Sequence, residues 1–235
     1  KASVAYSDKV AGKASQILLD GYRLWSSDTQ DVDRPHKVNK DFSLQSAQGE
    51  MIHGRYLYGM RKYGLAEQRV DRALELDPVL VPALTLKSML CLRKMEYQKA
   101  YEYANRALAV TEYDPEANYI SGQAAMKLGK VYDAMDRFEI AAITTDLRSA
   151  AYTRLAQIHF NCGDKELAED YARKSLIGNS YNVTAYRILY QICPSEDILS
   201  ELDRLDPLSH FADAERMLAG KITAEQAKIG YVGAY

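Results

Sequence analysis

Residues 97–110 read YQKAYEYANRALAV, and this stretch sets the period of the chain. Its alanines Ala100, Ala104 and Ala107 lie at helical spacing. An alanine returns every 34 residues at the position of the first of them, as Ala66, Ala134 and Ala168. A period of this length is typical of stacked helix–turn–helix units that bury their apolar faces against one another. The sequence therefore predicts an all-α fold, a right-handed α-solenoid with an extra N-terminal helix and C-terminal capping helices.

The period divides the 235 residues into four segments. We expect a helix over 3–25 and a long loop within 1–41, four repeats in 42–180, a degenerate fifth repeat in 181–206, and a capping helix and tail in 207–235. The helices predicted within the four repeats are 43–61, 63–76, 79–94, 97–110, 115–128, 131–144, 148–161 and 165–177. Pro78 and Pro115 suit the first turn of a helix, where the missing N–H costs nothing.

A second row of small residues lies twelve positions before the alanine row. It consists of Gly54, Ser88, Gly122 and Ala156, again 34 apart. Two neighbouring helices approach closely only if the facing positions are small, so the two rows are predicted to mark the contact between the paired helices.

This combination of small, apolar and alanine positions resembles the tetratricopeptide repeat, over about residues 47–180. The family's tryptophan at the fourth position is absent, and Glu50, Leu84, Asn118 and Tyr152 stand there. In the fifth repeat Tyr190 replaces the small residue and Leu202 replaces the alanine. We therefore expect these helices to pack less closely and the solenoid to end near Leu202. The same departures leave homodimerisation through this end as a further alternative.

The resemblance implies that first-helix residues line a concave partner-binding groove. The 34-residue period then predicts an apolar and aromatic floor with amide and guanidinium donors. The predicted groove residues are Arg55, Tyr58, Met89, Tyr119, Gln123, Met126, Arg154, Gln157, Phe160, Arg187 and Gln191. Such a surface suits an extended peptide or a helix. The alternative is that the groove is filled by the chain's own N-terminal or C-terminal helix.

One family use of this groove, a carboxylate clamp for chaperone C-termini, needs Lys and Asn at particular positions. Those positions hold other residues here, namely Met51, Arg55, Leu86, Glu116 and Ile120. That clamp is therefore not predicted.

No constellation in the sequence indicates catalysis, a metal or a cofactor. The four histidines are far apart, and no phosphate loop, GxSxG or HExxH motif is present. Three cysteines without CxxC spacing make a zinc site improbable, and Cys91 and Cys193 are expected to be buried thiols. Asn182-Val183-Thr184 fits a glycosylation sequon. We predict a non-enzyme that needs no cofactor.

Charge and hydropathy narrow the class of partner further. Thirty basic against 32 acidic residues give a net charge of −2, so no basic field indicates nucleic acid. No run approaches the ~18 apolar residues of a membrane span. The expected partner is a protein, a peptide or a neighbouring domain of the same parent chain.

A narrower resemblance covers about residues 60–218. Tyr113-Asp114-Pro115 and Asp206-Pro207-Leu208 are among the runs similar to the repeat-bearing C-terminal part of large bacterial proteins that carry a β-rich, carbohydrate-associated domain. This resemblance implies a fragment of a larger bacterial protein, soluble in the cytoplasm or periplasm. It also raises an alternative function, that of an accessory helical domain in a carbohydrate-processing enzyme.

Overall fold

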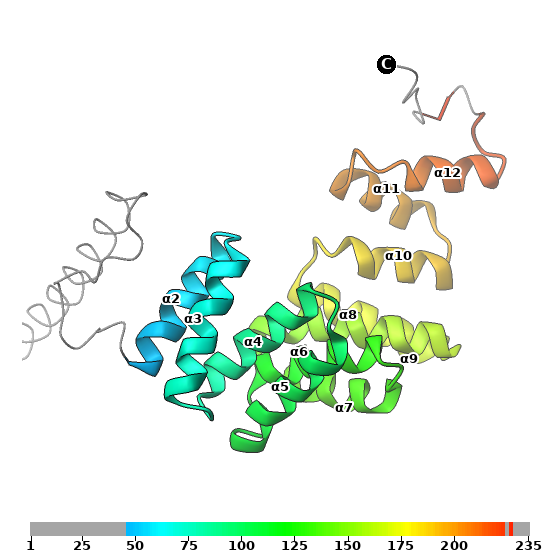
Figure 1. The fold of residues 1–235 in the computed structure, drawn as a ribbon. Coiled ribbons are helices and arrows are strands. Elements are labelled where there is room, and N and C mark those ends of the chain that lie inside the picture. Colours follow the sequence, from blue (N-terminus) through cyan, green and yellow to red (C-terminus); the bar gives the residue numbers. More distant parts are fainter. Residues whose placement is uncertain (1–45, 224–225, 228–235) are drawn as a thin grey trace, which may run out of the picture. The chain divides into compact units, whose positions relative to one another are not determined.

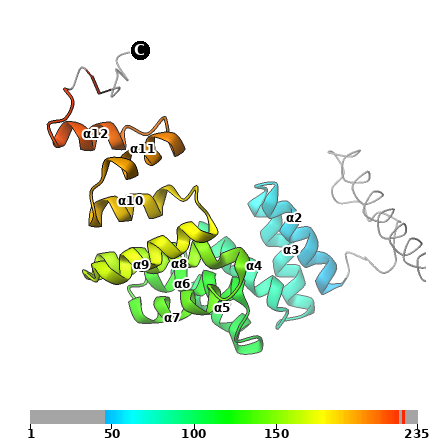
Figure 2. The ribbon, with the colours of Figure 1, turned by 180° about the vertical axis from the view of Figure 1, so that it is seen from behind.

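The computed structural model describes residues 46–223, 226 and 227, and every regular element among them is an α-helix (Figures 1 and 2). The helices are α2 (Ala47–Gly59), α3 (Tyr63–Leu76), α4 (Val81–Arg93), α5 (Tyr97–Val110), α6 (Pro115–Lys127), α7 (Val131–Ala141), α8 (Thr145–Cys162), α9 (Lys165–Gly178), α10 (Val183–Ile192), α11 (Glu196–Leu205) and α12 (Phe211–Leu218). The predicted all-α class is confirmed. The predicted segment 1–41, with its helix and loop, lies outside the described residues.

The chain divides after Ala83 into two compact units. In the first unit α2 packs on α3. Ser46 caps α2 by accepting a hydrogen bond from the Gly49 N–H at 3.0 Å. Gly54 is buried at the contact, where an added Cβ would lie 3.0 Å from Cγ2 of Val70 and 3.3 Å from the carbonyl oxygen of Ala66. The predicted small-against-alanine contact is therefore present in this unit.

In the second unit each helix from α5 to α12 packs on the next one along the chain. The first helices of successive repeats also contact one another, α6 with α8 and α8 with α10. This second set of contacts makes the first helices a continuous layer, which is what positions the candidate site. The main core cluster between α6, α7 and α8 is built around Phe138, which is completely buried.

The close-packing rows occupy helix contacts in this unit too. The hydroxyl of Ser88 donates a 2.6 Å hydrogen bond to the carbonyl of Ala100. A Cβ added to Gly122 would lie 2.9 Å from Cε1 of Phe138. Glycine is therefore required where the facing second-helix residue is large.

Different side-chain pairs replace the missing tryptophan in successive repeats. Each pair joins the tryptophan position to the residue nineteen positions later. In the first repeat Glu50 is 3.4 Å from Arg69, and in the third Oδ1 of Asn118 accepts a 3.3 Å hydrogen bond from Arg137. In the fourth repeat the rings of Tyr152 and Tyr171 lie 5.7 Å apart. A polar pair or an aromatic pair thus fills the space that an indole would occupy.

The turn inside each of the four repeats contains one residue with positive φ. These residues are 34 apart: Arg61 (φ 60°), Met95 (φ 62°), Gly129 (φ 75°) and Gly163 (φ 89°). Only glycine adopts the left-handed region without steric cost, so the first two turns carry local strain that the last two avoid.

Several predicted helix boundaries are wrong by two to three residues: α4 begins at Val81 and not at 79, α7 ends at Ala141 and not at 144, and α8 begins at Thr145 and not at 148. The 34-residue period itself breaks in the fifth repeat, where α11 begins at Glu196, 31 residues after the start of α9 at Lys165. Pro194 is the physical reason, because the residue before a proline disfavours helix, and Ser195 then caps α11 at once through the Ile198 N–H. Pro78 was expected to begin a helix, but it lies in a turn, and Pro82 occupies the first turn of α4.

The end of the fifth repeat is covered by α12. Leu202 is only 4% exposed and packs with Leu199 and Ala212, and the Tyr190 ring meets Phe211 edge-on at 5.9 Å. These contacts come from α12, which lies within the segment 207–235 where a capping helix was predicted beyond the last repeat. Cys91 is buried as predicted, whereas the prediction for Cys193 was wrong, because it follows the end of α10 and is exposed.

Salt bridges fasten α12 to α11. Arg216 lies 2.7 Å from Glu196 and 2.6 Å from Asp203, and Lys221 adds a 3.0 Å contact to Glu196. Hydrogen bonds from Arg216 and Lys221 lower the pKa of Glu196, and the hydrogen bonds to Asp203 and Glu196 hold the pKa of Arg216 above its usual value.

Candidate partner-binding surface

The predicted groove residues are divided between the two units. Arg55 and Tyr58 lie on α2 in the first unit, where the first is exposed and the second is half-buried. The other nine lie on α4, α6, α8 and α10 in the second unit, and we call them the first-helix surface: Met89, Tyr119, Gln123, Met126, Arg154, Gln157, Phe160, Arg187 and Gln191.

The first-helix surface is partly open to solvent along its length. Gln191 is exposed, and the other eight residues are half-buried. Because α6, α8 and α10 contact one another, the side chains of successive repeats are neighbours on one layer of helices. A partner could therefore contact several repeats at once.

The apolar residues of this surface are anchored in the core beneath it. Tyr119 meets Phe138 edge-on with ring centroids 5.5 Å apart, and Met126 packs on the same cluster. Phe160 packs on the cluster around Ala156 and Ile188. Side chains held in this way lose little conformational entropy when they bind a partner.

Arg154 and Gln157 form a polar pair in the middle of the surface. Nη1 of Arg154 donates a 2.9 Å hydrogen bond to Oε1 of Gln157. The amide nitrogen of Gln157 and the remaining guanidinium N–H groups are then available as donors. The pair supplies donors and a positive charge rather than acceptors.

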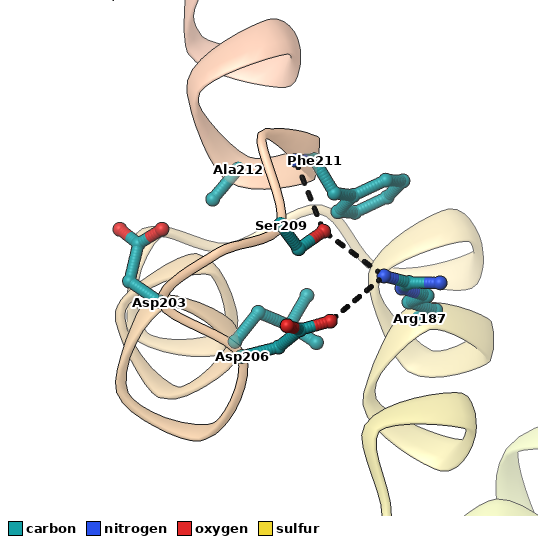
Figure 3. Close-up of a pocket in the computed structure, with 7 residues that line it drawn as sticks. Arg187, Asp203, Asp206, Ser209, Phe211 and Ala212 are labelled. Carbon is teal, nitrogen blue, oxygen red and sulfur yellow. Dashed lines mark hydrogen bonds and ion pairs between the residues drawn. The ribbon is translucent and has the colours of Figure 1, made fainter. Parts of the chain in front are cut away.

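Arg187 forms an ion pair, a hydrogen bond and a ring contact within the chain (Figure 3). Its Nη2 is 3.4 Å from Asp206 and 3.1 Å from the Ser209 hydroxyl, and its guanidinium lies over the Phe211 ring at 5.3 Å. The sequence suggested a free donor. In the structure this arginine instead joins α10 to the segment that leads into α12.

A cluster of hydroxyl and amide groups that the sequence did not indicate joins α8, α9 and α10. Nδ2 of Asn182 donates to Thr153 at 2.6 Å and to Ser175 at 2.8 Å, and its Oδ1 accepts from the Ala185 N–H at 3.2 Å to cap α10. The Ser149 hydroxyl donates to the Ser175 carbonyl at 2.9 Å. Asn182, the sequon residue, therefore has its amide fully engaged inside the fold.

An open cavity of about 480 Å³ lies outside the first-helix surface, beside α7, α8 and α9. Its lining includes Glu139, Tyr152, Tyr171 and Lys174. Burial, and next the charge of Glu139, raise the pKa of Tyr171, whose hydroxyl lies 3.3 Å from that carboxylate. The Tyr171 ring is already stacked on His159 at 5.4 Å. The residues that line the cavity are therefore engaged in contacts between packed helices.

The described residues contain no cluster of metal-ligand side chains. Within this part of the chain no three His, Cys, Asp or Glu side chains gather closely enough to hold a metal ion. His159 is buried, and its Nδ1 lies 3.5 Å from Asp164. Nor is any helix between residues 46 and 223 long and apolar enough to cross a membrane.

Comparison with known proteins identifies the repeat. Residues 149–176 match a tetratricopeptide repeat model. Anaphase-promoting complex subunit 3 of Schizosaccharomyces pombe (strain 972) is 25% identical over 172 residues, which are 72% of this chain but only 26% of that protein. The chain thus spans about a quarter of the curated relative that it matches.

Two solved structures share the fold. YrrB, a TPR protein with an unusual peptide-binding site, has a TM-score of 0.60 at 16% identity, over 73% of this chain and 92% of that one. PilF of Pseudomonas aeruginosa has a TM-score of 0.65 at 16% identity, over 74% and 85% of the two chains. The described chain therefore has the fold of a tetratricopeptide-repeat solenoid, and α8 and α9 form the repeat that matches the model.

Proposed function

We propose that this chain is a non-catalytic scaffold that binds an extended segment of a partner on its first-helix surface. The partner is another protein, a peptide, or a neighbouring domain of the same larger bacterial parent protein. The observation that carries the proposal is the row Met89, Gln123, Gln157 and Gln191, whose three glutamines place amide donors on α6, α8 and α10 beside an anchored apolar floor.

The chemistry of the surface suits an extended chain. Backbone carbonyls of such a chain accept hydrogen bonds, and the amide nitrogens of Gln123 and Gln157 can donate them. Apolar side chains of the same segment would contact Met126 and Phe160. The likeness to YrrB supports a tetratricopeptide solenoid in this role, because that protein has a peptide-binding site.

Selection of random peptides displayed on phage against the full chain tests the proposal. Anisotropy of the labelled, selected peptides should show about tenfold weaker binding to the double variant Gln123→Ala/Gln157→Ala, the loss expected for about 1.4 kcal/mol. The matched control is Gln98→Ala, since Gln98 lies on the second helix α5 and hydrogen-bonds Glu102. Equal affinity of both variants and wild type would remove this surface from consideration.

The alternative function is that of an accessory helical domain in a carbohydrate-processing enzyme, which the narrower sequence resemblance favours. Tyr171 lines the open cavity, but its ring is already stacked on His159 and is not free to stack on a sugar. Deleting these repeats from the parent protein and assaying glycan turnover distinguishes the two functions. Unchanged turnover would eliminate the accessory role.

A further inference from the structure

Arg154 stands in a helix position that is aliphatic in every other repeat. Residues 34 apart at this position are Ile52, Leu86, Ile120, Arg154 and Ile188. Within the second unit Leu86, Ile120 and Ile188 are each no more than 6% exposed, whereas Arg154 is half-buried. The fold accommodates a plain aliphatic side chain here, so packing alone does not require a guanidinium.

The charge of Arg154 is not neutralised by the part of the chain that the structure describes. Its one hydrogen bond there goes to the neutral amide oxygen of Gln157 at 2.9 Å, and no described carboxylate pairs with it. The other cation of the first-helix surface, Arg187, has Asp206 at 3.4 Å. None of the nine residues of that surface is acidic. A half-buried guanidinium without a counter-ion is costly unless a partner supplies one.

We propose that Arg154 binds a side-chain carboxylate of an acidic, partly apolar partner segment that extends across α6, α8 and α10. This inference rests on the proposed function and names the chemistry of its partner. Guanidinium is the donor best suited to a carboxylate, because its N–H groups match both oxygens. Gln157 orients the guanidinium from the neighbouring turn of α8.

The position of Arg154 favours an internal carboxylate over a chain terminus. The first-helix surface continues on both sides of it, toward Gln123 on α6 and toward Gln191 on α10. A segment that contacts both must run past Arg154 in both directions. The acidic residue therefore lies within the segment, with apolar residues beside it for Met126 and Phe160.

Selected peptides provide the test, with each Asp or Glu replaced in turn by Asn or Gln. Against wild type, one such replacement should weaken binding about tenfold, as expected for a lost charge-assisted hydrogen bond. Arg154→Leu should cause the same loss for the acidic peptide and no further loss for the neutralised one. Amidation of the peptide C-terminus should leave the affinity unchanged.

Two further variants separate recognition from a structural role. Arg154→Leu restores the residue type found at Leu86, so its melting temperature should equal or exceed that of wild type. Arg173→Leu is the matched control, because it also removes a positive charge, but from α9, where Arg173 pairs with Glu169. This variant should bind the peptide as tightly as wild type. Arg154→Lys should retain part of the affinity for the acidic peptide.

The results distinguish the two proposals. If the Gln123→Ala/Gln157→Ala variant loses binding but Arg154→Leu does not, the carboxylate inference is wrong and the scaffold function stands. Equal loss of acidic and neutral peptides in Arg154→Leu, or weaker binding after amidation of the peptide C-terminus, also overturns the inference. If no selected peptide depends on either glutamine, both proposals fail.

Discussion

Replacing Gly122 by alanine should destabilise the second unit, although alanine is the better helix former. The new Cβ would lie 2.9, 3.0 and 3.1 Å from three ring carbons of Phe138. Carbon atoms prefer about 3.5–4.0 Å, and the fully buried ring has no free space to enter. Overpacking typically costs about 1–3 kcal/mol, and three contacts this short place Gly122→Ala in the upper part of that range, about 2–3 kcal/mol. The helix propensity of alanine returns about 1 kcal/mol. The free energy of unfolding should therefore fall by about 1–2 kcal/mol.

Urea denaturation followed by circular dichroism measures this loss. The matched control is Gly64→Ala on α3, where an added Cβ meets no atom within 4 Å, so it should be neutral or stabilising by up to about 1 kcal/mol. The double variant Gly122→Ala/Phe138→Ala recreates the alanine pair of the fourth repeat, Ala156 and Ala172. The double variant should lose less free energy of unfolding than the two single variants lose together, by about 1 kcal/mol or more. A Gly122→Ala protein as stable as wild type, or strict additivity, would refute the close-contact explanation.

Four other predictions follow from single features. Met95→Gly should stabilise the chain by up to about 1 kcal/mol in urea denaturation, because glycine adopts its φ of 62° without strain; a loss would contradict this. Asn182→Ala should cost about 2 kcal/mol by removing a helix cap and two hydrogen bonds, with earlier hydrogen exchange in α10; unchanged exchange would count against the cluster. Because the pKa of Glu196 is lowered, its contact with Arg216 stabilises α12 above about pH 4.5, and this stabilisation is lost as the pH falls through the folded-state pKa. The protection of α12 from hydrogen exchange should therefore fall with pH in wild type; the same fall in Glu196→Gln would contradict this explanation. The raised pKa of Tyr171 contributes stability below pH 10 that is lost as the pH rises; phenolate absorbance, compared with Tyr171→Phe, would contradict this if it appeared at or below pH 10.

The repeat period accounts for most of the fold that could be predicted. Helices α3 and α5 begin and end where the sequence placed them, because Ala66 and Ala100 fix the contact with the preceding helix. The period fails at α11, where Pro194 ends one helix and Ser195 caps the next. A local breaker of this kind overrides a register that is inherited from earlier repeats.

The candidate surface was only partly accessible to sequence reasoning. The period placed Gln123 and Gln157 at corresponding positions on α6 and α8, which contact each other. The period could not show that Arg187 pairs with Asp206, because α11 and α12 do not follow the 34-residue spacing. The aliphatic row interrupted by Arg154 is visible in the sequence, but its importance depends on the ion pairs of the folded chain.

Photo-crosslinking from the first-helix surface tests the central proposal most directly. A benzophenone amino acid replaces the exposed Gln191 on α10 in the full chain, and the matched site is the exposed Arg173 on α9. Irradiation with a selected peptide should give a crosslinked product from position 191 and little from position 173. A product from position 173 alone, or equal yields from both, would contradict the assignment of partner binding to this surface.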